Sequence, residues 1–135
     1  MAQLNSTIKK ALMDSELFPL ATATPQGIPN VVPIKYVLIE NDQTLWLVDN
    51  FMNKTLTNIQ QNPFAALYVY QPEAKLCVQI KGRLELMNSG PDFERMRQKV
   101  HETRPDLPAK SLVILHLTEL YQCMPGPEAG LKMDS

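Results

Sequence analysis

The chain has 135 residues, with 14 acidic and 13 basic side chains, a formal net charge of −1, and 11 prolines against 5 glycines. This length fits one domain, residues 1–135, that buries its own core. The interspersed charges exclude the basic surface that nucleic acid or an anionic membrane requires. No apolar run is long enough to span a bilayer, and the polar N-terminal stretch does not resemble a signal peptide. Cys77 and Cys123 lack metal-ligand spacing, so we expect a cytoplasmic protein with reduced thiols.

The first 40 residues predict a helix followed by two strands. Asn5 or Ser6 caps the helix, whose apolar stripe contains Leu4, Ile8, Ala11 and Leu12. Residues 18–24 predict a strand, and residues 29–39 predict its antiparallel return. The return strand contains two prolines, which favour an edge strand, a bulge or a segment open to a ligand.

The second half of the chain adds three strands, at residues 64–70, 75–87 and 111–121. Gly82 within the second of these predicts a bulge or a close backbone approach. Between the last two strands, Ser89 with an acidic residue three positions later resembles a capping box. It opens a helix whose core stripe is Phe93, Met96 and Val100. With the strand that ends at Asp49, six short strands with connecting helices predict a mainly β protein, a small antiparallel barrel.

The candidate binding site is the turn from Asp49 to Thr55. The apolar residues 45–48 predict a buried strand before it, and a short helix follows that stops before a proline. Asn53 falls at the N-cap, and Lys54 and Thr55 fall in the first helical turn. Free backbone N–H groups, a lysine ammonium and a threonine hydroxyl there suit a phosphate group. The alternative is an ordinary capped helix with a solvated lysine.

Three segments resemble the pyridoxamine 5′-phosphate oxidase-like, FMN-binding split-barrel family. Residues 20–34 are similar to its opening hairpin, and residues 49–63 to its phosphate-binding strand-to-helix turn with the terminal Asn-Pro. Residues 78–85 are similar to its long strand that contains a glycine. The segments occur in the family's order, and the likeness extends over residues 20–121, chiefly to the small FMN-binding proteins.

The resemblance implies a six-stranded split barrel with Greek-key topology that forms a homodimer and holds FMN at the subunit interface. It assigns the FMN phosphate to Lys54 and Thr55, with Asn53 contributing through its cap geometry. The residues that line the isoalloxazine ring or lie beside its reactive edge are then Val32, Pro33, Ile34, Asp49, Asn50 and Phe51. Gln79 and the Met124-Pro125 segment are further candidates, supplied by the partner subunit.

The expected function is therefore that of an FMN-dependent oxidoreductase or electron-transfer protein, with a nicotinamide or a protein as electron donor. True pyridoxamine 5′-phosphate oxidases carry an arginine-x-histidine motif near the C-terminus. Residues 121–135 contain neither residue type, so pyridoxamine phosphate oxidation is not expected. The alternatives are a non-catalytic flavin carrier, a dimeric interaction module without a cofactor, or a haem protein, which would need His101 or His116. We assign no catalytic residue and no metal site.

Overall fold

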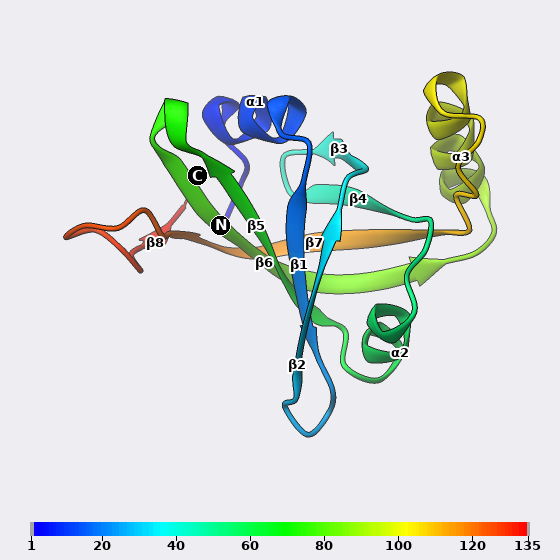
Figure 1. Cartoon of the computed structure of the whole chain (residues 1–135), viewed down its shortest axis with the longest axis horizontal. Coiled ribbons are helices and arrows are strands. Elements are labelled where there is room, and N and C mark those ends of the chain that lie inside the picture. Colours follow the sequence, from blue (N-terminus) through cyan, green and yellow to red (C-terminus); the bar gives the residue numbers. More distant parts are fainter. Residues whose placement is uncertain (1, 135) are drawn as a thin grey trace.

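An antiparallel sheet forms the centre of the computed structural model, which describes residues 2–134 (Figure 1). Its eight strands within that part are β1 (Phe18–Ala23), β2 (Pro29–Ile34), β3 (Val37–Asn41), β4 (Thr44–Asp49), β5 (Phe64–Gln71), β6 (Leu76–Met87), β7 (Ser111–Gln122) and β8 (Lys132–Met133). Seven follow the order β2-β1-β5-β6-β7-β4-β3, and β8 pairs with β7. The helices are α1 (Ser6–Asp14), α2 (Lys54–Gln61) and α3 (Pro91–Thr103), with a 3₁₀ turn at Pro72–Ala74.

The mainly β, antiparallel architecture with short helices is confirmed, but the six-stranded barrel is not. The described sheet has eight strands, and its edge strands β2 and β3 do not close it into a barrel. The expected single strand over residues 29–39 is divided at Lys35 and Tyr36, so β2 joins one edge and β3 the other. The proline-containing β2 lies at an edge, as the sequence predicts, because proline lacks the N–H that a second neighbour would require.

The strand β4 is buried on both faces, which explains its unbroken apolar sequence. Leu45 and Leu47 lie in the main core, together with residues of α1, β1, β5, β6 and β7. Trp46 and Val48 point to the other face, where they pack in a second cluster against α3. The residues that α3 contributes to this cluster are those of its predicted stripe, Phe93, Met96 and Val100.

The helix ends agree with the sequence at α1 and differ at α3. Asn5 caps α1, and its side-chain Oδ1 accepts a hydrogen bond of 2.8 Å from the backbone N–H of Ile8. The expected Ser89 cap of α3 is wrong: Gly90 occupies the N-cap with a φ of +102°, and Pro91 begins the helix. Proline suits this position because its missing N–H has no partner there in any case. No helix in residues 2–134 has the length and apolar character needed to cross a membrane.

Gly82 marks a bulge in β6, as predicted, where the register with β7 shifts between Lys81 and Gly82. A Cβ atom at this position would lie 2.5 Å from the backbone oxygen of His116 and 2.7 Å from the Cδ2 atom of Leu115. Only glycine allows the two longest strands to approach this closely without displacement.

Candidate functional site

A cavity of about 530 Å³ lies between β2, the loop after β4, the start of α2 and the loop after α3. Its volume falls within the range of about 300–1,000 Å³ that is usual for small-molecule and cofactor pockets. Eight residues expected to bind the cofactor line it: Val32, Pro33, Ile34, Asn50, Phe51, Asn53, Lys54 and Thr55. The cavity therefore brings together two segments that are separate in the sequence.

One end of the cavity is formed by the first turn of α2. Lys54 is exposed there, whereas Thr55 is only 1% exposed. The Oγ1 atom of Thr55 accepts a hydrogen bond of 3.1 Å from the side-chain amide of Asn30, which leaves its own proton available to a ligand in the cavity. Asn53 occupies the N-cap, as the sequence predicts, and its side chain makes no capping hydrogen bond. The N–H groups of this turn are thus not satisfied by that side chain.

A buried polar network supports this turn from below. The side-chain amide of Asn30 also donates a hydrogen bond of 3.2 Å to the hydroxyl oxygen of Thr22. The side-chain amide of Asn58 on α2 donates one of 3.0 Å to the same oxygen. Thr22 and Asn58 are both buried. Because buried polar groups are costly without partners, these bonds fix α2 against the β1–β2 hairpin and hold Thr55 at the cavity.

The middle of the cavity has an apolar wall. Val32, Pro33 and Ile34 of β2 form one side, and Met52 lies on the loop after β4. Phe51 belongs to the same loop and is 79% exposed, which is unusual for a phenylalanine. This wall suits a flat, partly apolar ligand.

Two expected residues, Asp49 and Gln79, lie outside the cavity lining. Asp49 is 1% exposed, and its carboxylate accepts hydrogen bonds of 2.5 Å from the Ser111 hydroxyl and 2.9 Å from the Met52 N–H. These bonds give Asp49 a structural task, which is to fix the loop that carries Phe51 and Met52. Gln79 lies exposed in the first third of β6.

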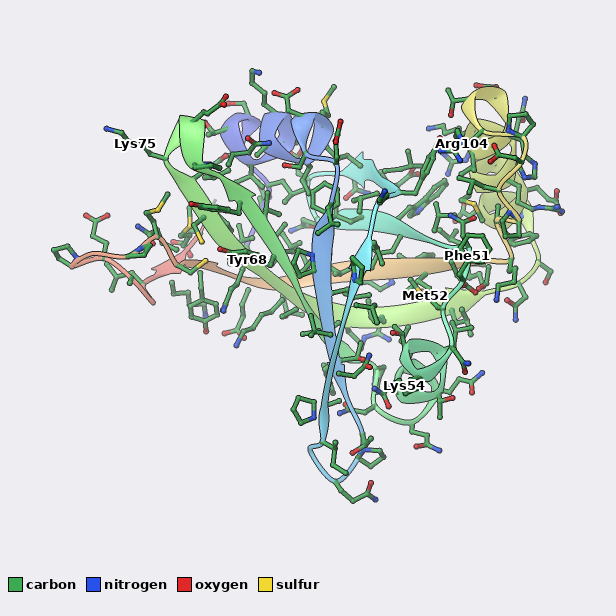
Figure 2. The ribbon with its side chains drawn as sticks, in the orientation of Figure 1. Phe51, Met52, Lys54, Tyr68, Lys75 and Arg104 are labelled. Carbon is green, nitrogen blue, oxygen red and sulfur yellow. The ribbon has the colours of Figure 1, made fainter. Side chains whose placement is uncertain are left out.

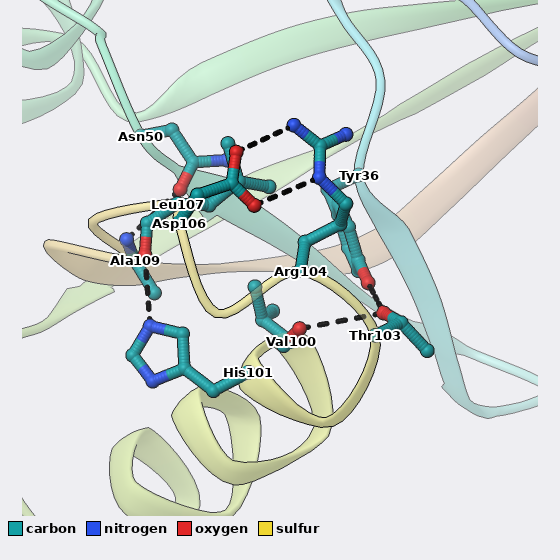
Figure 3. A network of polar contacts seen from close by, with 9 residues as sticks. All are labelled: Tyr36, Asn50, Val100, His101, Thr103, Arg104, Asp106, Leu107 and Ala109. Atoms are coloured by element: carbon teal, nitrogen blue, oxygen red, sulfur yellow. Dashed lines mark hydrogen bonds and ion pairs between the residues drawn. The ribbon is translucent and has the colours of Figure 1, made fainter.

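The other end of the cavity was not anticipated from the sequence. It is lined by Lys35, Tyr36, Arg104 and Leu107. Arg104 is held by Asp106 through bonds of 3.0 Å from Nε and 2.9 Å from Nη2 (Figure 3). Tyr36 contacts the hydroxyl of Thr103 at the end of α3. Sequence patterns gave no signal for this end because it forms only when the loop after α3 folds back to the β2–β3 junction.

Asn50 connects the two loops on either side of the cavity. Its side-chain oxygen accepts a hydrogen bond of 2.9 Å from the backbone N–H of Ala109 (Figure 3). Ala109 is buried and has a φ of +44°, which is uncommon for a residue with a side chain. The hydrogen bond that Ala109 donates to Asn50 therefore helps to hold the loop after α3 in an otherwise unfavourable conformation.

The charged side chains that line the cavity are all cations, namely Lys35, Lys54 and Arg104. Arg104 and Lys54 lie at opposite ends, with Phe51 and Met52 between them (Figure 2). The hydrogen bonds from Asp106 raise the pKa of the Arg104 guanidinium and lower that of the Asp106 carboxyl, so both stay charged near neutral pH. The arrangement can hold an apolar body with an anionic group at each end.

The two histidines lie outside this lining. His116 Nε2 is 2.9 Å from a Glu85 carboxylate oxygen, and His101 Nε2 is 2.8 Å from the Leu107 carbonyl oxygen. Within residues 2–134, no three or more histidine, cysteine, aspartate or glutamate side chains gather in a way that could hold a metal ion.

The fold and the cavity together define a small antiparallel β protein with a pocket lined by apolar and cationic side chains. Residues 4–124 match the family model described as pyridoxamine 5′-phosphate oxidase, and the chain belongs to this family. It is 33% identical over 133 residues to the uncharacterized protein MJ0282 of Methanocaldococcus jannaschii, covering 96% of this chain and 87% of that protein.

Solved structures share the fold at low identity. HupZ of Group A Streptococcus has a TM-score of 0.78 and 22% identity, with 94% of this chain and 100% of that one covered. A pyridoxamine 5′-phosphate oxidase-related, FMN-binding protein of Nostoc punctiforme has a TM-score of 0.70 and 18% identity, with 95% and 88% covered.

Proposed function

We propose that the protein binds FMN in this cavity and acts as an FMN-dependent oxidoreductase or electron-transfer protein. The observation that carries the proposal is the position of Lys54 and Thr55, at a helix start that opens into a cavity with an apolar wall. The FMN phosphate would bind the first turn of α2, and the ring would pack against Val32, Pro33 and Ile34. Bound FMN supplies hydride or single-electron transfer, and the chain supplies binding, orientation and exclusion of water.

The second cationic end supports a catalytic role over that of a carrier. A carrier needs one anion site for the FMN phosphate, whereas Arg104 offers another at the far end of the same cavity, which Lys35 also lines. The bonds of Arg104 to Asp106 use Nε and Nη2, which leaves Nη1 to donate to a ligand. We assign this end to an anionic reaction partner, such as the phosphate groups of a nicotinamide electron donor.

We also propose that the protein is a homodimer in which the partner subunit covers the cavity. Val31 on the edge strand β2 is 65% exposed, Phe64 at the start of β5 is 60% exposed, and Phe51 projects at the cavity itself. The register aligns Val31 with Ala21 on β1 and Ala21 with Ala66 on β5. An apolar row across neighbouring strands marks an interaction surface in a small protein. The exposed Gln79 of the partner is the residue we expect to approach the FMN.

A haem-binding function is less well supported by the site. The histidine that haem would require does not line the cavity, and each histidine already has a hydrogen-bond partner. The cationic ends and the Thr55 hydroxyl suit a phosphate ester better than a porphyrin iron.

The test is the visible absorption spectrum of the purified protein before and after addition of FMN. Twin flavin bands, with FMN and not FAD released on heating, are expected. Reduction by NADH or NADPH under anaerobic conditions should then bleach the bands, and Lys35→Met should raise the donor concentration required without weakening FMN binding. A colourless protein that does not bind added FMN would overturn the proposal. A bound flavin that is reduced by light but not by a nicotinamide or a protein donor would instead indicate a flavin carrier.

A further inference from the structure

The two cysteines of the chain meet on neighbouring strands, far apart in the sequence. Cys77 lies near the start of β6, and Cys123 directly follows the end of β7. The strand register that pairs Val78 with Gln122 continues to Cys77 and Cys123. The backbone N–H of Cys123 donates a hydrogen bond of 2.8 Å to the carbonyl oxygen of Cys77. Their Sγ atoms are 2.8 Å apart. Both thiols are free.

The two thiols differ in access to solvent. Cys77 is 3% exposed, and its thiol donates a hydrogen bond of 3.1 Å to the hydroxyl of Tyr68. Cys123 is only half-buried. Burial, followed by the hydrogen bond with Cys77, raises the pKa of Cys123 to about 12. The hydrogen bond with Cys77 likewise raises the pKa of Tyr68 to about 12. Cys123 is therefore protonated near neutral pH and reacts slowly.

We propose that Cys77 and Cys123 are a modification site at which a small-molecule disulfide is reduced and an intrachain disulfide forms across β6 and β7. In the first step the accessible Cys123 sulfur attacks the small disulfide R–S–S–R. Its S–S bond breaks, the Cys123 proton passes to the departing sulfur, and one R–SH leaves. In the second step the Cys77 sulfur attacks Cys123, and its own proton leaves with the second R–SH.

The geometry makes the second step intramolecular. Cys77 is buried against Cys123 and needs no movement of either strand to reach it, since directly opposed residues of antiparallel strands fall within the Cα separation that a disulfide spans. A mixed disulfide at Cys123 should thus be short-lived in the intact pair and stable when Cys77 is absent.

The disulfide would link the start of β6 to the end of β7, from which the chain returns to form β8. It would close a loop between positions 46 residues apart, which constrains the unfolded chain and raises the thermal midpoint by roughly 5–15 °C. Tyr68, next to Cys77, lies well away from Lys54 and Phe51 in Figure 2. The site is therefore separate from the cavity of its own subunit.

The experiment treats the folded full-length protein with glutathione disulfide and follows its intact mass. The wild type should lose two hydrogen atoms and carry no lasting glutathione, and a non-reducing peptide map should join the peptides of Cys77 and Cys123. Cys77→Ser should retain one glutathione, and Cys123→Ser should stay largely unmodified because its remaining thiol is buried. Dithiothreitol should reverse the change of mass and of thermal midpoint.

Three outcomes would overturn the inference. The first is a wild-type protein that keeps a glutathione adduct as long as Cys77→Ser does. The second is a disulfide between two chains in place of the intrachain link. The third is a wild type that stays unmodified while Cys77→Ser reacts. The peptide map on the wild type needs no variant, so it decides the matter even if a serine variant folds poorly.

Discussion

The clearest test of the phosphate site is Lys54→Met, which removes the ammonium group and keeps most of the apolar stem. A charge-assisted contact to phosphate contributes about 1.5–3 kcal/mol. Because Lys54 is exposed to solvent, the lower half of this range applies. At 1.4 kcal/mol for each factor of ten, we expect FMN affinity to fall about 10- to 40-fold.

The assay is quenching of flavin fluorescence on titration with the protein, with FMN and, in parallel, with riboflavin, which lacks the phosphate. Riboflavin affinity should stay unchanged in Lys54→Met, and the loss for FMN should shrink as salt is raised, because exposed charges are screened. Lys75→Met is the matched control, since this exposed lysine lies at the opposite side of the molecule (Figure 2). Equal FMN affinity in Lys54→Met and wild type, or an equal loss for riboflavin, would refute the assignment of the phosphate to this turn.

Three further predictions concern stability and thiol chemistry. Gly82→Ala should destabilise the protein by about 1–3 kcal/mol in urea unfolding, because the new Cβ would lie 2.5 Å from a backbone oxygen of β7; an unchanged midpoint would contradict the close approach. Met96→Ala should cost about 2–5 kcal/mol in the same assay, because Met96 is fully buried between α3 and the sheet, and a smaller loss would mean that the second cluster is loosely packed. Alkylation of Cys123 by iodoacetamide should speed up about tenfold for each pH unit between 7 and 9, because its raised pKa leaves little thiolate at neutral pH. A rate that levels off near pH 8 would show an ordinary thiol.

The helices and the individual strands could be predicted because their signals are local. The stripe Phe93, Met96 and Val100 has helical spacing, and Gly82 interrupts a strand whose other residues alternate. The break at Lys35 and Tyr36 could not be predicted, because both residues are compatible with an extended strand. Only the tertiary structure shows that β2 and β3 belong to opposite edges of the sheet.

The same distinction applies to the sites. Lys54 and Thr55 could be found because a helix start next to a buried strand is visible in a few consecutive residues. Arg104 could not, because it reaches the cavity only through the fold of the loop after α3, which Asn50 holds at Ala109. The meeting of Cys77 with Cys123 depends on the register between β6 and β7, and the bulge at Gly82 shifts that register by an amount that the sequence does not specify.

The break between β2 and β3 is also the reason that a cavity exists. A continuous strand over residues 29–39 would pair along one edge and leave no opening beside Val48. In the structure, the backbone N–H of Val48 donates a hydrogen bond of 3.1 Å to the carbonyl oxygen of Tyr36. Because the chain crosses from one edge of the sheet to the other within Lys35 and Tyr36, these residues and the end of β2 face the start of α2 across an open space. The prolines of β2 have the same consequence, since they prevent another strand from pairing at this edge and keep its apolar residues available to a ligand. The departure from a simple barrel and the binding site thus have one structural cause.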